Sequence, residues 1–187
     1  MHVISDYIDK IPNLSKADKA KLHYVISCII YEGSKIFLFL IFFSCIHQLN
    51  SLFYSMIILL PLRIISGGLH FKHYTACLAF SFLYFYMAIV VLEPFKLPIG
   101  ISSLLLIVCA VINYKIGPVT SISRPQLKPE EIKKGKLNIF IATCYEVILT
   151  MLFFDTVLST IGFWTIVLHT LQLIIANFRK KRGEISD

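Results

Sequence analysis

The stretch 63–77 contains glycines, imidazoles and a thiol at the edge of a hydrophobic segment. A cysteine acts as a nucleophile only as a thiolate, so near neutral pH it needs a neighbouring base or a positive potential. The nearest bases to Cys77 are His70 and His73. These residue types predict an activated cysteine nucleophile, Cys77, at a membrane surface.

The spacing leaves the identity of the base open. In one continuous helix, His70 and Cys77 would share a face but lie about 10 Å apart along the axis, beyond the roughly 3 Å that proton transfer needs. His70 can therefore act only through a bent chain, which Gly67 and Gly68 would permit, or across a subunit boundary. His73 precedes Cys77 by four residues and could contact it on a regular helix without a bend.

The position of the thiol relative to a helix start matters as well. A helix that begins near Tyr74 would place Cys77 in its first turn, where free backbone N–H groups and the helix dipole favour a thiolate. Arg63 and Lys72 would add positive potential. The site therefore needs neither a metal nor another cofactor.

The composition is that of a membrane protein. Of the 187 residues, 57% are hydrophobic, and the mean hydropathy is +0.75, whereas soluble domains are roughly half apolar. A membrane-crossing helix needs about 20 apolar residues. The fold class predicted is an all-α integral membrane protein with about six transmembrane helices, at 25–46, 51–66, 74–92, 98–116, 138–156 and 158–177.

The second of these windows is the weakest. Pro61 and Arg63 interrupt it, so a short, tilted or re-entrant helix is expected. A protein with four full spans and two half-inserted segments is the alternative architecture.

The whole chain, 1–187, is predicted to be a single membrane domain. Its N-terminal segment carries acids and lysines without a cleavage motif, so it is not a secretory signal, and a helix is expected to begin near Lys16. The predicted parts are an amphipathic lead-in helix (1–24), a helical membrane bundle (25–177), a basic loop within it (117–136) and a basic tail (178–187).

The basic residues predict the orientation. They concentrate in the N-terminal segment, the 63–77 stretch, the 115–136 loop and the tail, whereas Lys96 alone lies on the opposite side of the membrane and Lys35 lies inside a span. The positive-inside rule then places both termini and the 63–77 stretch in the cytoplasm. Dispersed loop charges do not make a nucleic-acid surface, but they would attract anionic membrane lipid.

Three charged residues deep within the apolar windows need an explanation. Glu32 and Lys35 are three residues apart, so they are expected to form an ion pair, and Glu32 is also a candidate for orienting the catalytic histidine or the substrate. Glu146 has no evident local partner and is expected to face the interior of the bundle.

In its motif, length and hydropathy, the chain resembles the accessory gene regulator protein B (AgrB) family. The resemblance rests on Arg63, Gly67, Gly68, His70 and Cys77 at their spacing, near the end of a membrane segment. It extends over essentially the whole chain and includes the proline-containing basic loop. Members of that family are membrane cysteine endopeptidases of Gram-positive bacteria that process a small propeptide into a quorum-sensing signal.

The resemblance implies specific roles. Cys77 would be the nucleophile and His70 the base, with Arg63 and Gly68 as supporting residues and His73 as the second candidate base. The substrate would be a small AgrD-like propeptide, whose own Cys or Ser side chain resolves the thioester into a thiolactone or lactone ring. The protein would act as a homodimer in the bacterial cell membrane, with its site facing the cytoplasm.

Two other classes of function compete with this one. His70, His73 and Cys77 could form a soft-metal site in a small metal or ion transporter. A non-catalytic membrane scaffold that binds a partner kinase or peptide is the other alternative, and an inert Cys77 would favour it.

Overall fold

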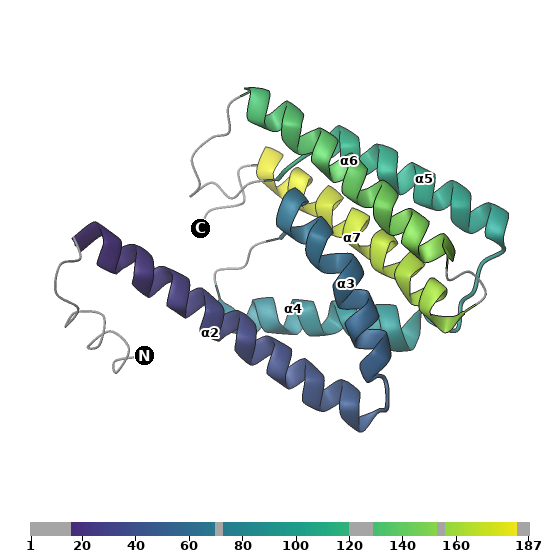
Figure 1. The fold of residues 1–187 in the computed structure, drawn as a ribbon, viewed down its shortest axis with the longest axis horizontal. Coiled ribbons are helices and arrows are strands. Elements are labelled where there is room, and N and C mark those ends of the chain that lie inside the picture. The colour runs from purple at the N-terminus through teal and green to yellow at the C-terminus, as the bar shows by residue number, and fades with distance from the viewer. Residues whose placement is uncertain (1–15, 70–72, 120–128, 153–155, 183–187) are drawn as a thin grey trace. The chain divides into compact units, whose positions relative to one another are not determined.

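The computed structural model describes residues 16–69, 73–119, 129–152 and 156–182, and the elements in these ranges are helices. The only β-type pairing in them is an isolated bridge between Gly67 and Val119. The predicted all-α class is therefore confirmed. The helices are α2 (Lys16–Cys45), α3 (Leu49–Ser66), α4 (Tyr74–Tyr86), α5 (Ile99–Ile116), α6 (Pro129–Leu152) and α7 (Val157–Lys181), and α4 continues into a π-helical segment, η1 (Met87–Val91) (Figure 1).

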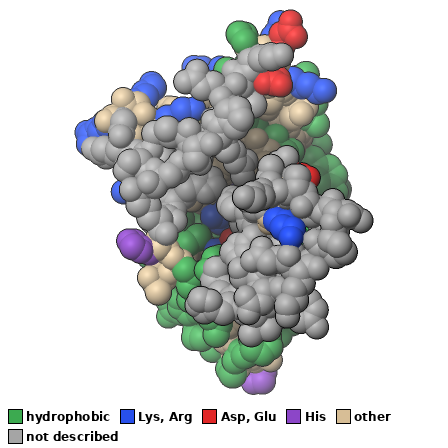
Figure 2. All heavy atoms as spheres, turned by 90° about the vertical axis from the view of Figure 1, so that its left-hand side faces the viewer, with side chains coloured by type: hydrophobic (Ala, Val, Ile, Leu, Met, Phe, Trp, Pro, Cys, Tyr) green, Lys and Arg blue, Asp and Glu red, His purple; other side chains and the backbone are tan. Residues whose placement is uncertain are grey.

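Five helices are long and apolar enough to cross a membrane: Leu49–Ser66, Tyr74–Val91, Ile99–Ile116, Pro129–Leu152 and Val157–Lys181. They correspond to five of the six predicted windows. The remaining window, 25–46, lies within α2, whose side chains are described only in part. Large hydrophobic side chains such as Ile64 and Leu152 are exposed, as lipid contact requires, and hydrophobic side chains are visible along the lower left and bottom edge of the face in Figure 2.

The second window forms one continuous helix, α3, with Pro61 inside it. Proline lacks an amide N–H, so one intrahelical hydrogen bond is missing, but the helix continues to Ser66. At about 1.5 Å per residue, its 18 residues extend about 27 Å, close to the roughly 30 Å of a bilayer core. The expected short helix is thus present without a break at Pro61.

Two helix starts bear on the sequence predictions. The helix expected near Lys16 begins there, as α2. The final part of the predicted basic loop is helical, because α6 begins at Pro129, well before the apolar window at 138. Proline at the first position and Glu130 and Glu131 in the first turn favour a helix start at this point.

The chain divides into two compact units, 1–45 and 46–187. Of the first unit, the structure describes α2. In the second, α7 contacts α3, α5, α6 and η1, and α5 and α6 pack beside it (Figure 1). Leu106, Ile139, Ile161 and Ile166 are among the fully buried core residues. Because α7 contacts all of these elements, its side chains make many of the contacts that fix the other helices of the second unit.

One end of the second unit brings together segments that are distant in the sequence. Leu69, which follows α3, packs with Val119, which follows α5, and with Leu173 and Ala176 near the end of α7. Lys96 lies elsewhere, at a small cavity lined also by residues at the start of α7. The sorting of the basic segments to one side of the membrane, and the cytoplasmic assignment of that side, stay predictions.

Candidate active site

Cys77 lies in the first turn of α4. The helix begins at Tyr74, as predicted, and the amide of Cys77 donates a hydrogen bond of 3.1 Å to the carbonyl of His73. The thiol side chain is half-buried. Cys77 therefore lies at the N-terminal end of α4, as predicted.

His73 is the residue that caps this helix. Its backbone is extended, with φ −102° and ψ 132°, and its side chain is exposed and makes no capping hydrogen bond. It therefore precedes the helix, and the regular i, i+4 side-chain contact with Cys77 that a continuous helix would give does not apply. His70, the other candidate base, lies outside the described residues.

The glycine pair forms the turn that follows α3. Gly67 has φ +76°, a left-handed conformation that glycine adopts readily, and its amide donates to the carbonyl of Arg63 at 3.0 Å. The amide of Val119 donates to the carbonyl of Ser66 at 2.9 Å. A Cβ atom on Gly67 would collide with the carbonyl oxygen of Val119. Both the conformation and the close approach of Val119 thus require glycine, and the predicted bend is confirmed at Gly67.

Gly68 approaches a different neighbour. A Cβ atom on Gly68 would lie 2.9 Å from Nε2 of Gln172, a residue of α7. Gln172 was not singled out from the sequence, because nothing local distinguishes it from other polar residues in an apolar window. Its position i+3 from His169 puts both residues on one face of α7, which is the signal that could have indicated a shared role.

Arg63 lies in the last turn of α3 and is partly buried. Its carbonyl accepts the hydrogen bond from the amide of Gly67, so the predicted supporting residue lies directly before the turn that follows α3. Its charge contributes to the positive potential of this end of the bundle.

His169 has a partner that the sequence could not reveal. Its Nε2 atom lies 3.0 Å from Oγ of Ser66, the last residue of α3. The imidazole is buried, with 1% of its surface exposed.

Leu69 after α3 and Phe80 on α4 share one buried hydrophobic cluster. Leu69 belongs to the buried cluster at this end of the bundle, and Phe80, three residues after Cys77, packs against the same cluster. The structure thus brings the supporting residues of α3 and the first turns of α4 to one end of the second unit.

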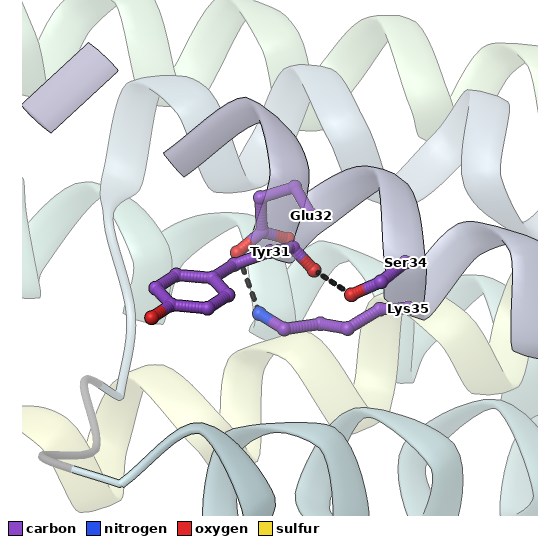
Figure 3. A network of polar contacts seen from close by, with 4 residues as sticks. All are labelled: Tyr31, Glu32, Ser34 and Lys35. Carbon is purple, nitrogen blue, oxygen red and sulfur yellow. Dashed lines mark hydrogen bonds and ion pairs between the residues drawn. The ribbon is translucent and has the colours of Figure 1, made fainter. Parts of the chain in front are cut away.

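Glu32 forms the expected ion pair with Lys35, with Oε1 and Nζ 2.6 Å apart (Figure 3). Beside it, the hydroxyl of Ser34 donates to the carbonyl of Tyr31 at 2.9 Å. These contacts lie within α2. A role for Glu32 in orienting the catalytic histidine or the substrate stays a prediction, because α2 belongs to the other unit.

A metal site can be assessed only in part. Among the residues that the structure describes, no group of three His, Cys, Asp or Glu side chains could hold a metal ion. The alternative site of His70, His73 and Cys77 includes a residue outside those ranges, so it is not tested.

Comparisons with known proteins give a consistent result. The family model of accessory gene regulator B (AgrB) matches residues 1–173. An AgrB-like protein of Clostridium beijerinckii is 30% identical over 113 residues, which cover 60% of this chain and 57% of that protein. No solved structure matches the chain.

Proposed function

Because this chain belongs to the accessory gene regulator B family, we propose that it is a multi-pass membrane enzyme that processes a small AgrD-like signal propeptide. In this proposal Cys77 is the nucleophile and His70 the base. The observation that carries it is the position of Cys77 in the first turn of α4, the next helix in the chain after the turn made by Gly67 and Gly68.

The proposed reaction is acyl transfer. His70 takes the proton of the Cys77 thiol, and the thiolate attacks a peptide carbonyl of the propeptide. The C–N bond breaks as His70 returns the proton to the leaving amine, and the acyl group remains on Cys77 as a thioester. N–H groups at the start of α4 are available to hold the oxyanion.

The thioester then has two possible fates. A Cys or Ser side chain of the acylated substrate can attack the same carbonyl, which closes a thiolactone or lactone ring and releases the Cys77 thiol. Water would instead give a linear acid. Exchange of one thioester for another is nearly balanced in energy, so cyclisation prevails if water is kept from the site, and a position at the membrane edge would help to exclude it.

The other residues support this reaction in the proposal. The Arg63 guanidinium stabilises the thiolate or the substrate carboxylates, Gly67 and Gly68 let the chain turn so that His70 reaches Cys77, and His73 is the second candidate base. The enzyme acts as a homodimer in the bacterial cell membrane, in contact with anionic lipid, and its site faces the cytoplasm.

The test is intact-protein mass spectrometry of the purified chain in lipid nanodiscs after incubation with the propeptide encoded beside its gene. We expect a mass increase on Cys77 equal to one fragment of the propeptide, which would also identify the cleaved bond. The matched control is Cys144→Ala, because Cys144 is half-buried like Cys77 but lies on α6. Cleavage without any adduct, or an adduct that survives Cys77→Ala, would contradict the proposal. Bound zinc or copper that is lost on changing His70, His73 or Cys77 would favour the metal-site alternative.

A further inference from the structure

His169 and Gln172, two buried polar side chains of α7, differ in their contacts from the buried threonines of that helix. Thr165 and Thr170 each donate a hydrogen bond to a carbonyl of α7 itself, at 2.8 and 3.0 Å, which is a common way to satisfy a hydroxyl in a membrane helix, and Thr165 also contacts Ser55 of α3 far from the turn. His169 and Gln172 lie against the end of α3 and the turn that follows it. They are 1% and 2% exposed. This pair therefore connects α7 to the turn that precedes His70.

The direction of the His169 contact can be assigned. The Ser66 hydroxyl has one proton, and its strongest acceptor is the carbonyl of Leu62 at 2.6 Å. Ser66 Oγ therefore accepts the N–H of His169 Nε2 at 3.0 Å. Because its proton is committed to Leu62, Ser66 is not an activated nucleophile. The contact is a clamp between the last residue of α3 and α7.

Gln172 lies against the next residue but one of the turn, Gly68. Its carboxamide lies against Gly68, so the absence of a side chain at that position is what admits it. Neither its Nε2 nor its Oε1 has a hydrogen-bond partner among the described residues. A buried amide is costly unless it is paired, so this carboxamide is suited to bonding the backbone of the turn at Gly68.

Together with Val119, these residues hold the turn. Ser66 contacts His169, Gly67 is bridged to Val119, and Gly68 lies on Gln172. The buried Leu69 follows, and the next residue in the sequence is His70. We propose that His169 and Gln172 are positioning residues that fix the turn at Ser66, Gly67 and Gly68, through which α3 leads to the proposed catalytic residues. This inference rests on the proposed cysteine peptidase function.

A second contact between the same two helices provides a matched control. Ser55 and Thr165 are joined by a buried hydrogen bond of 2.8 Å between α3 and α7, about three helical turns before Ser66. If contacts between these helices only stabilise the bundle, then Ser55→Ala and Ser66→Ala should have similar effects. If the Ser66 contact positions the turn, only Ser66→Ala should lower turnover.

The experiment measures cleavage of the propeptide encoded beside the gene by the full chain in lipid nanodiscs. For Ser66→Ala, His169→Ala and Gln172→Leu, we expect kcat to fall about 10- to 100-fold with KM nearly unchanged, because a small misplacement of a catalytic group is sufficient for such a loss. Ser55→Ala and Thr165→Val should keep kcat within about two-fold, well below the effect of a misplaced catalytic group. His169→Gln retains an N–H donor near the position of Nε2 and should restore most of the turnover.

A second readout does not depend on the propeptide. In a chain whose only cysteine is Cys77, the rate of alkylation by iodoacetamide against pH reports how readily the thiolate forms. We expect the profile to move to higher pH in Ser66→Ala and His169→Ala, and to remain unchanged in Ser55→Ala.

The possible failures are distinguishable. If the native chain cleaves the propeptide and Ser66→Ala matches Ser55→Ala in kcat and in alkylation, the positioning role is overturned and the proposed function stands. If the native chain does not cleave the propeptide, the proposed function fails and the positioning role fails with it.

Discussion

Cys77 is the residue whose removal should be least tolerated by the reaction. We expect Cys77→Ala and Cys77→Ser to lower propeptide cleavage by roughly a thousand-fold or more, because no acyl-enzyme can form with alanine and a serine hydroxyl is a far weaker nucleophile. Membrane insertion should be unchanged, since the side chain is only half-buried. The measurement is product formation by mass spectrometry, with protein in the membrane fraction quantified beside it. Normal processing by either variant would rule out the peptidase.

The two imidazoles can be separated in the same assay. We expect His70→Ala to lose far more cleavage activity than His73→Ala, because His73 is exposed and only caps α4. His73→Asn is a useful companion variant, since asparagine is a good helix cap and would preserve the helix start. A larger loss for His73→Ala than for His70→Ala would make His73 the base.

Gly67 and Gly100 form a second contrast. At Gly67, alanine would have to adopt a left-handed conformation, at about 1–2 kcal/mol, and its Cβ would collide with the Val119 carbonyl. At Gly100, in the first turn of α5, nothing lies within 4 Å of the added carbon, so the change should stay within about 0.5 kcal/mol. Thermal unfolding in detergent would measure both. Equal stability of the two variants would mean that Val119 can move away from the turn at little cost.

At the scale of the elements, α7 shows most clearly what sequence reasoning could and could not predict. The apolar window at 158–177 predicted a helix there, and the helix is present as Val157–Lys181. Its central place in the bundle was not predictable, because that depends on contacts such as Ser66 with His169, 103 residues apart in the chain. Polar residues on a membrane helix can be located from the sequence, but their partners come from packing.

The stretch between α3 and α4 shows the same distinction. The start of α4 and the bend at Gly67 were predicted because both follow from local residue types. The approach of Val119 and Gln172 to this bend was not predicted, because those residues come from the far ends of other helices. The change from α4 to the π-helical η1 had no recognised sequence signal either.

Glu146 on α6 was correctly expected to face the interior. It is 1% exposed, and neither carboxyl oxygen has a hydrogen-bond partner among the described residues. We expect Glu146→Gln, which keeps the shape and cannot ionise, to change the free energy of unfolding by no more than about 0.5 kcal/mol. Glu130→Gln, at the exposed start of the same helix, is the control. A loss of about 3 kcal/mol or more would instead indicate that Glu146 holds a buried cation in place.

For the whole molecule, the basic segments predict which end of the bundle faces the cytoplasm. In intact cells, a membrane-impermeant maleimide should label a cysteine placed at Lys96 and should not label one at Lys134, in a chain without other cysteines. Both positions are exposed, so access to the side chain is not limiting. Labelling of both after permeabilisation is the control, and the opposite pattern in intact cells would reverse the orientation.

A glycine on a membrane helix can allow close packing within one molecule or between two copies of the chain. A Cβ atom on Gly162 would lie 2.8 Å from both Ile58 Cδ1 and Thr150 Oγ1, so this glycine serves the contact of α7 with α3 and α6. At Gly33 of α2, nothing lies within 4 Å of the added carbon. Gly162 is therefore committed to packing within the second unit.

The polar face of α7 also has a consequence for how the protein is made. Side chains such as His169 would be costly in lipid before they meet their partners. Synthesis proceeds from the N-terminus, so α3, with Ser55 and Ser66, leaves the ribosome before α7 does. The serines of α3 that contact α7 are thus already in the membrane when α7 is inserted. Because of this order of the helices along the chain, the polar side chains of α7 can meet their partners as the helix enters the bilayer.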